Sequence, residues 1–176
     1  MFFMIIGIDI AKELGLIENL CERELENPEG AGFDIRIGEI FKIKNYGFLG
    51  LENRKTPDIE LIASHGKHKE YFLKPEEYVL VKTIEKVNLP ENIVALTFPR
   101  STLQRCGVLL LATQTAPGYR GELTFGLKNL GEENFRLELG SRIAHIMFFE
   151  AKGKTTKYRG QWQDGRVTAE KEEKQT

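Results

Sequence analysis

Two short segments in the middle of the chain carry residue types that can bind phosphate. Residues 99–105 combine two guanidinium groups with two hydroxyl groups, on Arg100, Ser101, Thr102 and Arg105. A guanidinium pairs with two phosphate oxygens at once, and a hydroxyl adds a short hydrogen bond. Residues 116–122 form a Pro-Gly turn that opens onto an extended segment. A phosphate-binding loop close to a turn and a strand predicts a nucleotide pocket.

Length and composition limit the classes of protein that this chain can represent. Its 176 residues favour one domain, and 41% of them are hydrophobic, which is enough for a core. The formal net charge of -1 argues against a dedicated nucleic-acid-binding protein, which usually has a strong basic excess. The two cysteines, Cys21 and Cys106, form no CxxC pair, so neither a zinc ribbon nor a disulfide scaffold is indicated.

The chain shows no pattern typical of a membrane protein or a secretion signal. No apolar run approaches the length of a membrane span. Residues 1–8 are apolar, but they lack a basic segment before them and are soon followed by Asp9 and Lys12. We therefore expect a cytoplasmic protein that does not associate with membranes.

The spacing of apolar residues predicts an all-β fold after a short N-terminal helix over residues 8–20. Residues 44–71 are less regular and are interpreted as a hairpin or an inserted loop. Residues 168–176 are charged and have no apolar anchors, which predicts a disordered tail. The expected strands are separated by turn signals and lie in residues 33–38, 78–83, 93–98, 108–113, 123–127, 135–139 and 143–149.

Four blocks of this sequence, in the same order, resemble the superfamily of dCTP deaminases and trimeric dUTPases. They are residues 30–38, 100–107, 116–124 and 157–161. Each block is a weak signal alone, whereas four in order and at suitable spacing are specific. The resemblance covers roughly residues 28–166 and is closer to the dCTP deaminase branch, which includes archaeal-type dUTPases.

The resemblance implies one dUTPase-like domain over residues 1–167. Its fold would be a distorted jelly roll or β-barrel with a mobile C-terminal arm at about residues 151–167. It would assemble as a homotrimer with each active site at a subunit interface. The ligand would be a pyrimidine deoxyribonucleoside triphosphate bound with Mg²⁺, and no zinc would be needed.

The resemblance also implies roles for individual residues. Arg100, Ser101, Thr102 and Arg105 match the phosphate-binding loop, and Lys157 and Gln161 match the arm that closes over the triphosphate. Without the resemblance, these arginines could be surface ion-pair residues, and Lys157 and Gln161 could be solvated.

Further roles concern the sugar, the base and the metal. Tyr119 matches the aromatic beside the deoxyribose, and a simple core aromatic is the alternative. Asp34 matches an acid that holds the metal through water, and a structural carboxylate is the alternative. Ala112 and Thr124 belong to the nucleotide-binding set, and backbone groups at residues 124–126 would read the base.

At two positions the chain departs from the pattern on which catalysis depends. Ala116 stands where dUTPases have the carboxylate that activates water, and Gly126 stands where dCTP deaminases have the glutamate that shuttles protons. Neither a methyl group nor a hydrogen can transfer a proton. Glu122 shares the strand face of Gly126 but lies roughly 13 Å away along a strand, beyond hydrogen-bond reach. Gln114 could orient a water molecule but is a poor base.

Three further features of the sequence are candidates for catalysis, nucleotide binding or metal binding. An acid from a neighbouring subunit, or Asp164 on the arm, could replace the missing carboxylates. Trp162 could cap the nucleotide or pack structurally. His65 and His68 have no third metal ligand in view, and His145 in an apolar strand is interpreted as a hydrogen-bonded structural residue.

Three functions therefore remain open. The first is hydrolysis of dUTP to dUMP and pyrophosphate, which depends on positioning and charge stabilisation and could survive weakly without the acid. The second is deamination of dCTP by a relocated acid. The third is a non-catalytic protein that binds nucleotide or regulates a partner.

Overall fold

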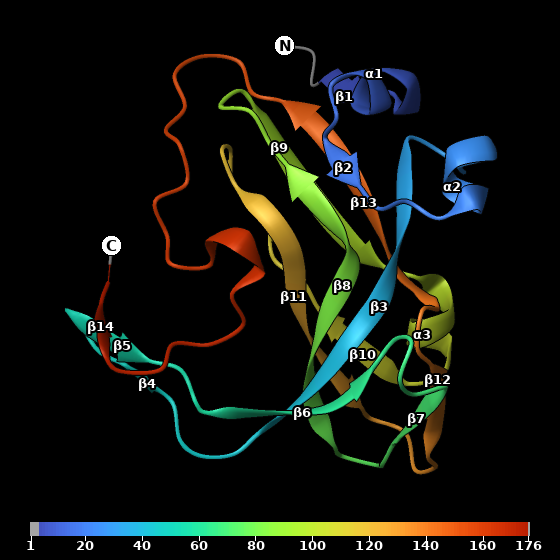
Figure 1. The fold of residues 1–176 in the computed structure, drawn as a ribbon, viewed down its shortest axis with the longest axis vertical. Helices are drawn as coiled ribbons and strands as arrows, with labels where there is room; N and C mark the ends of the chain where they lie inside the picture. Colours follow the sequence, from blue (N-terminus) through green and yellow to red (C-terminus); the bar gives the residue numbers. More distant parts are fainter. Residues whose placement is uncertain (1–3, 176) are drawn as a thin grey trace.

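The chain folds into a mostly β structure whose main sheet curls into a half-barrel (Figure 1). The computed structural model describes residues 4–175. Residues 1–3 of the apolar opening and residue 176 of the tail lie outside the described part. Among the described residues, no helix is both long enough and apolar enough to cross a membrane.

The main sheet has nine strands. Six of them follow the order β1-β13-β3-β8-β11-β10, while β2 pairs with β8, β6 with β3 and β9 with β13. Their bounds are β1 (Met4–Ile6), β2 (Ile17–Glu18), β3 (Gly32–Ile43), β6 (Ile59–Ser64), β8 (Tyr78–Asn88), β9 (Ile93–Pro99), β10 (Val108–Leu111), β11 (Arg120–Asn129) and β13 (Arg142–Glu150). All of the registered pairs are antiparallel.

Residue periodicity explains why these segments are strands. Every second residue of β8 is buried from Val79 to Val87, which leaves the alternate residues on the outer face. Strand β3 is buried on both faces along most of its length. Its register shifts against β6, β8 and β13, and such irregularities bend and twist a sheet. The predicted all-β fold is confirmed.

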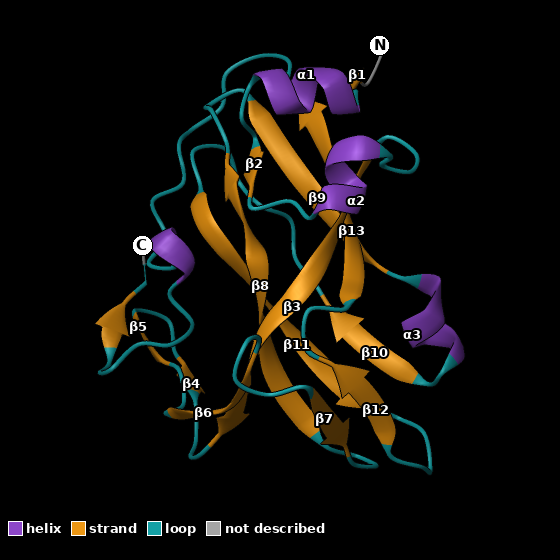
Figure 2. Cartoon of the chain, turned by 45° about the vertical axis from the view of Figure 1, so that its right-hand side comes forward, coloured by secondary structure: helices purple, strands orange, loops and turns teal. Residues whose placement is uncertain are grey.

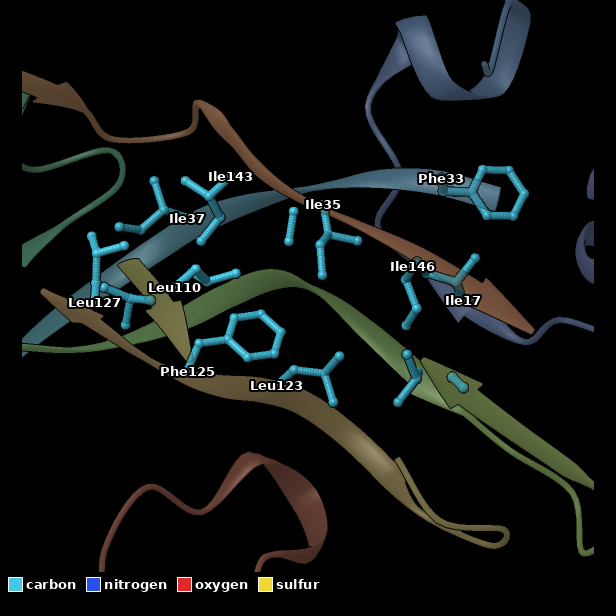
Figure 3. Close-up of a cluster of buried hydrophobic side chains, with 14 of the residues drawn as sticks. Ile17, Phe33, Ile35, Ile37, Leu110, Leu123, Phe125, Leu127, Ile143 and Ile146 are labelled. Atoms are coloured by element: carbon cyan, nitrogen blue, oxygen red, sulfur yellow. The ribbon is translucent and has the colours of Figure 1, made fainter. Parts of the chain in front are cut away.

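The core fills the concave side of the curled sheet (Figure 3). Figure 3 shows side chains from β3, β10, β11 and β13 pointing toward one another. The largest fully buried apolar members are Phe33, Phe148, Leu16, Ile35, Ile37, Ile40, Leu73, Leu127, Ile143 and Ile146.

The helices are short and lie at the edges of the sheet (Figure 2). They are α1 (Ile8–Glu13), α2 (Glu22–Glu26), α3 (Ser101–Arg105) and the 3₁₀ turn η1 (Gln163–Gly165). The helix predicted over residues 8–20 is shorter than expected. It gives way at Gly15, whose φ is +62°, and Ile17 and Glu18 then pair with β8.

Residues 44–71 form an inserted hairpin followed by two strands. The hairpin consists of β4 (Phe48–Leu49) and β5 (Asn53–Lys55), and it precedes β6 and β7 (Glu70–Leu73). Strand β7 pairs separately with β12 (Phe135–Glu138).

The C-terminal tail differs from the sequence-based expectation of disorder. Strand β14 (Glu173–Lys174) pairs with β5, and Ala169 is fully buried. The tail has one small apolar anchor and a neighbouring strand edge, and neither feature shows in its charged composition.

Candidate functional site

A cavity of about 340 Å³ lies between the turn before β11 and the C-terminal arm, residues 151–167. Gln114, Ala116, Tyr119 and Thr124 line it from one side. The sequence predicted Tyr119 and Thr124 for nucleotide binding, Gln114 for orienting water and Ala116 as the position of the missing carboxylate. The arm covers the other side with Tyr158, Trp162, Arg166 and Val167. Among the residues predicted for nucleotide binding, Ala112 packs at the margin of the core instead.

Tyr119 forms the wall of this cavity next to the arm. Its ring meets that of Tyr158 edge-on, with 5.4 Å between the centroids. Its hydroxyl donates a hydrogen bond of 2.7 Å to the carbonyl of Glu122. Burial raises the pKa of Tyr119 to about 12, so the phenol is neutral at physiological pH. Tyr119 therefore offers a rigid apolar face to a ligand.

The arm crosses β11 at close range because Gly121 has no side chain. Gly121 has a φ of +130°, and a Cβ atom there would lie 2.4 Å from the nitrogen of Gly165 in η1. The side chain of Gln163 adds two hydrogen bonds, accepting from the Arg120 amide at 2.8 Å and donating to the Gly118 carbonyl at 2.9 Å. These contacts hold the arm closed over its own chain.

No carboxylate is among the described residues that line the cavity. Glu122 pairs instead with Lys86, at 3.3 Å. Asp164 lines a different cavity, on the far side of η1, together with Lys157. Within one chain, neither acid considered from the sequence replaces the group that is missing at Ala116.

The other family position, Gly126, is covered by an aromatic ring. A Cβ atom at Gly126 would lie 2.2 Å from the hydroxyl oxygen of Tyr78. Tyr78 comes from β8, where it stands diagonally across from Gly126 in the sheet. Burial raises the pKa of Tyr78 as well. The space that a glutamate would need is therefore filled by a neutral phenol.

Gly126→Ala is expected to lower the free energy of unfolding by about 1 kcal/mol, the low end for overpacking, because Tyr78 is 37% exposed and can shift. In a Tyr78→Ala background the same change should cost nothing measurable. A urea double-mutant cycle measures the coupling. If Gly126→Ala lowers the free energy of unfolding equally in the wild-type and Tyr78→Ala proteins, the contact between these two residues is contradicted.

The phosphate-binding residues predicted around residue 100 lie on α3 and beside a second cavity. Arg100, Thr102 and Arg142 line this groove of about 420 Å³, with Arg136 at its rim. Ser101 and Arg105 are exposed on the helix. The sequence predicted a loop here. Arg100 is the N-cap of the helix and pairs with Asp34, whereas Arg105 in its last turn is exposed and available to a polyanion.

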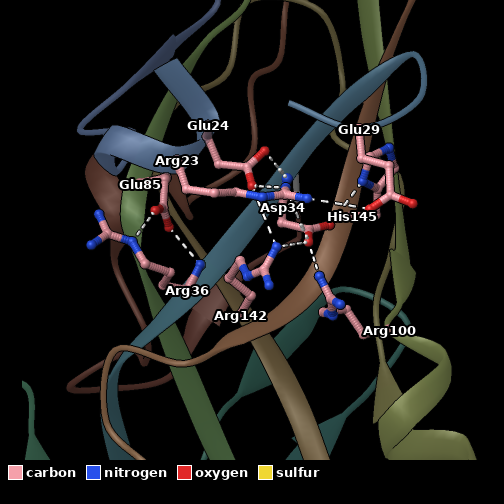
Figure 4. Close-up of polar contacts among 9 residues, drawn as sticks. All are labelled: Arg23, Glu24, Glu29, Asp34, Arg36, Glu85, Arg100, Arg142 and His145. Atoms are coloured by element: carbon pink, nitrogen blue, oxygen red, sulfur yellow. Dashed lines mark hydrogen bonds and ion pairs between the residues drawn. The ribbon is translucent and has the colours of Figure 1, made fainter. Parts of the chain in front are cut away.

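Behind this groove lies a network of buried acids and partly exposed arginines (Figure 4). Glu24 on α2 is fully buried, and its carboxylate accepts a hydrogen bond of 3.0 Å from the Asp34 amide. Arg23 pairs with Glu24 and lies 3.2 Å from Glu29. Burial, and then the neighbouring Arg142 and Arg23, lower the pKa of Arg100.

Asp34 is the centre of this network and does not fit a metal. Its Oδ1 atom lies 2.9 Å from His145 Nδ1, and its Oδ2 atom lies 2.9 Å from Arg142 and also pairs with Arg100. Guanidinium groups already surround the carboxylate and would repel a dication. No cluster of three or more His, Cys, Asp or Glu that could hold a metal occurs within residues 4–175. The contact with Asp34 confirms His145 as a hydrogen-bonded structural residue.

The structure separates the two halves of the predicted nucleotide site. The C-terminal arm, which covers the cavity, lies on one side of the sheet, and α3 lies on the other in both views (Figures 1 and 2). The two lining sets share no residue. Gln161 does not reach α3, because Arg54 of the inserted hairpin binds its side-chain oxygen.

Sequence reasoning missed three contributors to the site: Arg54, Tyr78 and Arg166. Gly126 could have indicated the contact with Tyr78, because a glycine inside a strand often marks a close approach by another group. No sequence pattern indicated Arg54 or Arg166, because each lies in a charged segment with no periodicity.

Comparison with known proteins agrees with this fold. A probable deoxyuridine 5'-triphosphate nucleotidohydrolase of Methanothermobacter thermautotrophicus is 32% identical over 141 residues, or 80% of this chain and 89% of that protein. A dCTP deaminase of Campylobacter curvus is 29% identical over 120 residues, and the chain spans 63% of its length. The crystal structure of the 2'-deoxycytidine 5'-triphosphate deaminase from Agrobacterium tumefaciens has the same fold, with a TM-score of 0.66 at 16% identity. It covers 85% of this chain and 48% of that one.

The family model described as dCTP deaminase-like matches residues 9–151, which hold most of the sheet, α3 and the turn under the arm. The chain therefore belongs to the dCTP deaminase-like family.

Proposed function

We propose that this chain binds a pyrimidine deoxyribonucleoside triphosphate and hydrolyses dUTP to dUMP and pyrophosphate. The observation that carries the proposal is the cavity under the closed arm, walled by Tyr119 and lined by the turn at residues 113–116. A cavity of about 340 Å³ falls within the usual range for small-molecule sites. Relatives of equal identity are named for this hydrolysis and for dCTP deamination, so the choice of uracil rests on residue 126.

Deamination is disfavoured by the contact between Tyr78 and Gly126. A proton shuttle at residue 126 would need the space of the Tyr78 phenol. Hydrolysis of dUTP needs no proton shuttle at residue 126. Water attacks the α-phosphorus and loses a proton to solvent, the bond to the bridging oxygen breaks, and pyrophosphate leaves with that oxygen. Gln114 can orient the water, and no carboxylate lines the cavity to activate it, so turnover should be slow.

The triphosphate would be bound by α3 of another copy of the chain. Helix α3, with Arg100 at its N-cap and Arg105 in its last turn, lies on the opposite side of the sheet from the arm that covers the cavity, so a complete site needs two chains. A homotrimer satisfies this requirement. Mg²⁺ would come with the triphosphate, because the carboxylate of Asp34 is already paired with cations. Sedimentation of the free protein measures the assembly, and a monomer that binds dUTP tightly would contradict a shared site.

A substrate panel tests the proposal. The protein is incubated with dUTP, dCTP, dTTP or UTP and Mg²⁺, and pyrophosphate, ammonia and binding are measured separately. We expect slow pyrophosphate release from dUTP, weak binding of UTP and no ammonia from dCTP. Tight binding of dUTP without turnover would select the non-catalytic alternative, which the carboxylate-free lining also favours. Ammonia release would overturn the argument from Tyr78.

Arg105→Ala is expected to weaken dUTP binding by about 1.5–3 kcal/mol, the usual value for a hydrogen bond to a charged group. Arg105 is the better test residue because Arg100 also pairs with buried Asp34, so its removal changes stability too. Calorimetry measures the affinity, and Lys67→Ala, an exposed cation outside the lining of both cavities, serves as the control. An unchanged affinity in Arg105→Ala would remove α3 from the site.

A further inference from the structure

The inserted hairpin, residues 44–58, holds the C-terminal arm from outside. After the arm has crossed the cavity, the chain continues to this hairpin. The Thr168 hydroxyl lies 2.6 Å from the Pro57 carbonyl, and the Ala169 amide donates to the Thr56 hydroxyl at 2.7 Å. Strand β14 then extends the hairpin into a three-stranded sheet, visible at the lower left of Figure 1.

Arg54 of β5 makes the contacts that reach back toward the cavity. Its guanidinium lies 5.7 Å from the ring centroid of Trp162, which lines the cavity. The same group donates a hydrogen bond to the side-chain oxygen of Gln161. One side chain thus fixes two neighbouring residues of the arm.

Two donors in this contact are buried with no acceptor among residues 4–175. They are the Nε atom of Arg54 and the Nε2 atom of Gln161. A buried N–H group without a partner weakens the state that contains it. The closed arm is therefore held by specific contacts and yet opens at a modest cost, which suits a segment that must admit a ligand.

We propose that Arg54 is a positioning residue that holds the arm closed over the nucleoside cavity of its own chain. The inference rests on the proposed function only for the identity of the ligand beneath the arm. The hairpin acts in cis: it sets the position of Trp162 and Gln161 before any nucleotide arrives. Binding then loses less conformational freedom than it would with a free arm.

Trp162 is the only tryptophan of the chain, so its fluorescence reports on the arm directly. Without nucleotide, Arg54→Met should raise the acrylamide quenching of Trp162 and speed tryptic cleavage at Lys157 and Arg159. Lys55→Met is the matched control, because this neighbouring lysine lies 5.2 Å over the Tyr46 ring and does not touch the arm. Arg54→Lys should keep Trp162 protected, because an ammonium can also lie over the indole.

Gln161→Met tests the same contact from the arm and should increase quenching without any change in the hairpin. Wild-type quenching and cleavage in both Arg54→Met and Gln161→Met would overturn the proposal. With dUTP, Arg54→Met should raise KM about tenfold and leave kcat within about twofold, as expected for the loss of a cation–π contact and a hydrogen bond. If the wild-type protein binds no nucleotide, the proposed function fails, while fluorescence and proteolysis still decide the role of Arg54.

Discussion

Ala116→Asp is expected to raise the rate of pyrophosphate release from dUTP by about 10²–10⁴-fold, the usual contribution of a positioned acid–base group. Ala116 lines the cavity beneath the arm, and the lining there holds no other carboxylate. An aspartate at this position would face the space in which water must approach the α-phosphorus. Its pKa would leave it ionised at neutral pH and able to accept a proton from that water.

Thr113→Asp is the matched control for this gain of function. It adds the same carboxylate to the lining of the same cavity, outside the position that the family uses. Only Ala116→Asp should accelerate hydrolysis, with dUTP affinity measured for both variants. An Ala116→Asp variant that binds dUTP at wild-type affinity and hydrolyses it no faster would refute the role assigned to this position.

Arg36→Met is expected to lower the free energy of unfolding by about 3–5 kcal/mol at neutral pH, the cost of leaving a buried charge without its partner. Glu85 is 1% exposed, and within residues 4–175 Arg36 is the one cation in salt-bridge contact with it, at 2.6 Å. The Arg36 amide adds a second hydrogen bond of 2.7 Å. The methionine would keep the backbone bond and remove the charge.

The loss in Arg36→Met should depend on pH in a defined direction. Burial raises the pKa of Glu85 above its ordinary value of 4.5, against the lowering effect of Arg36. The folded state therefore holds this proton more tightly than the unfolded state. Stability falls as the pH rises from the ordinary value through the raised one. Without Arg36 the pKa of Glu85 rises further. The loss of unfolding free energy in Arg36→Met should therefore become smaller toward acid pH.

Urea unfolding at several pH values measures this effect. Arg36→Met combined with Glu85→Leu should recover most of the stability, because replacing a buried ion pair by apolar groups is often close to neutral. Lys44→Met breaks an ion pair of 2.6 Å between exposed residues and should change stability far less. A deficit in Arg36→Met that does not vary with pH would contradict the burial of an ionised Glu85.

The sequence predicted the fold well because strand periodicity and the four blocks report on local structure and on family. It also placed Gln114, Ala116, Tyr119 and Thr124 near one another, since they share a single turn and the strand after it. The predicted roles of Asp34 and Gln161 depend on what lies opposite them in space. Asp34 is enclosed by Arg100 and Arg142, and Gln161 by Arg54, from segments distant in the chain. The local sequence pattern does not indicate which distant residues these side chains contact.

The ring of Tyr78 above Gly126 also bears on how this chain can change over generations. A glutamate introduced at residue 126 would have to displace the phenol, which is 37% exposed and can move at a cost. A smaller residue at position 78 would make space for the longer side chain but would supply no acid. Proton transfer at this position therefore depends on two residues, and a change at residue 126 alone alters only one of them.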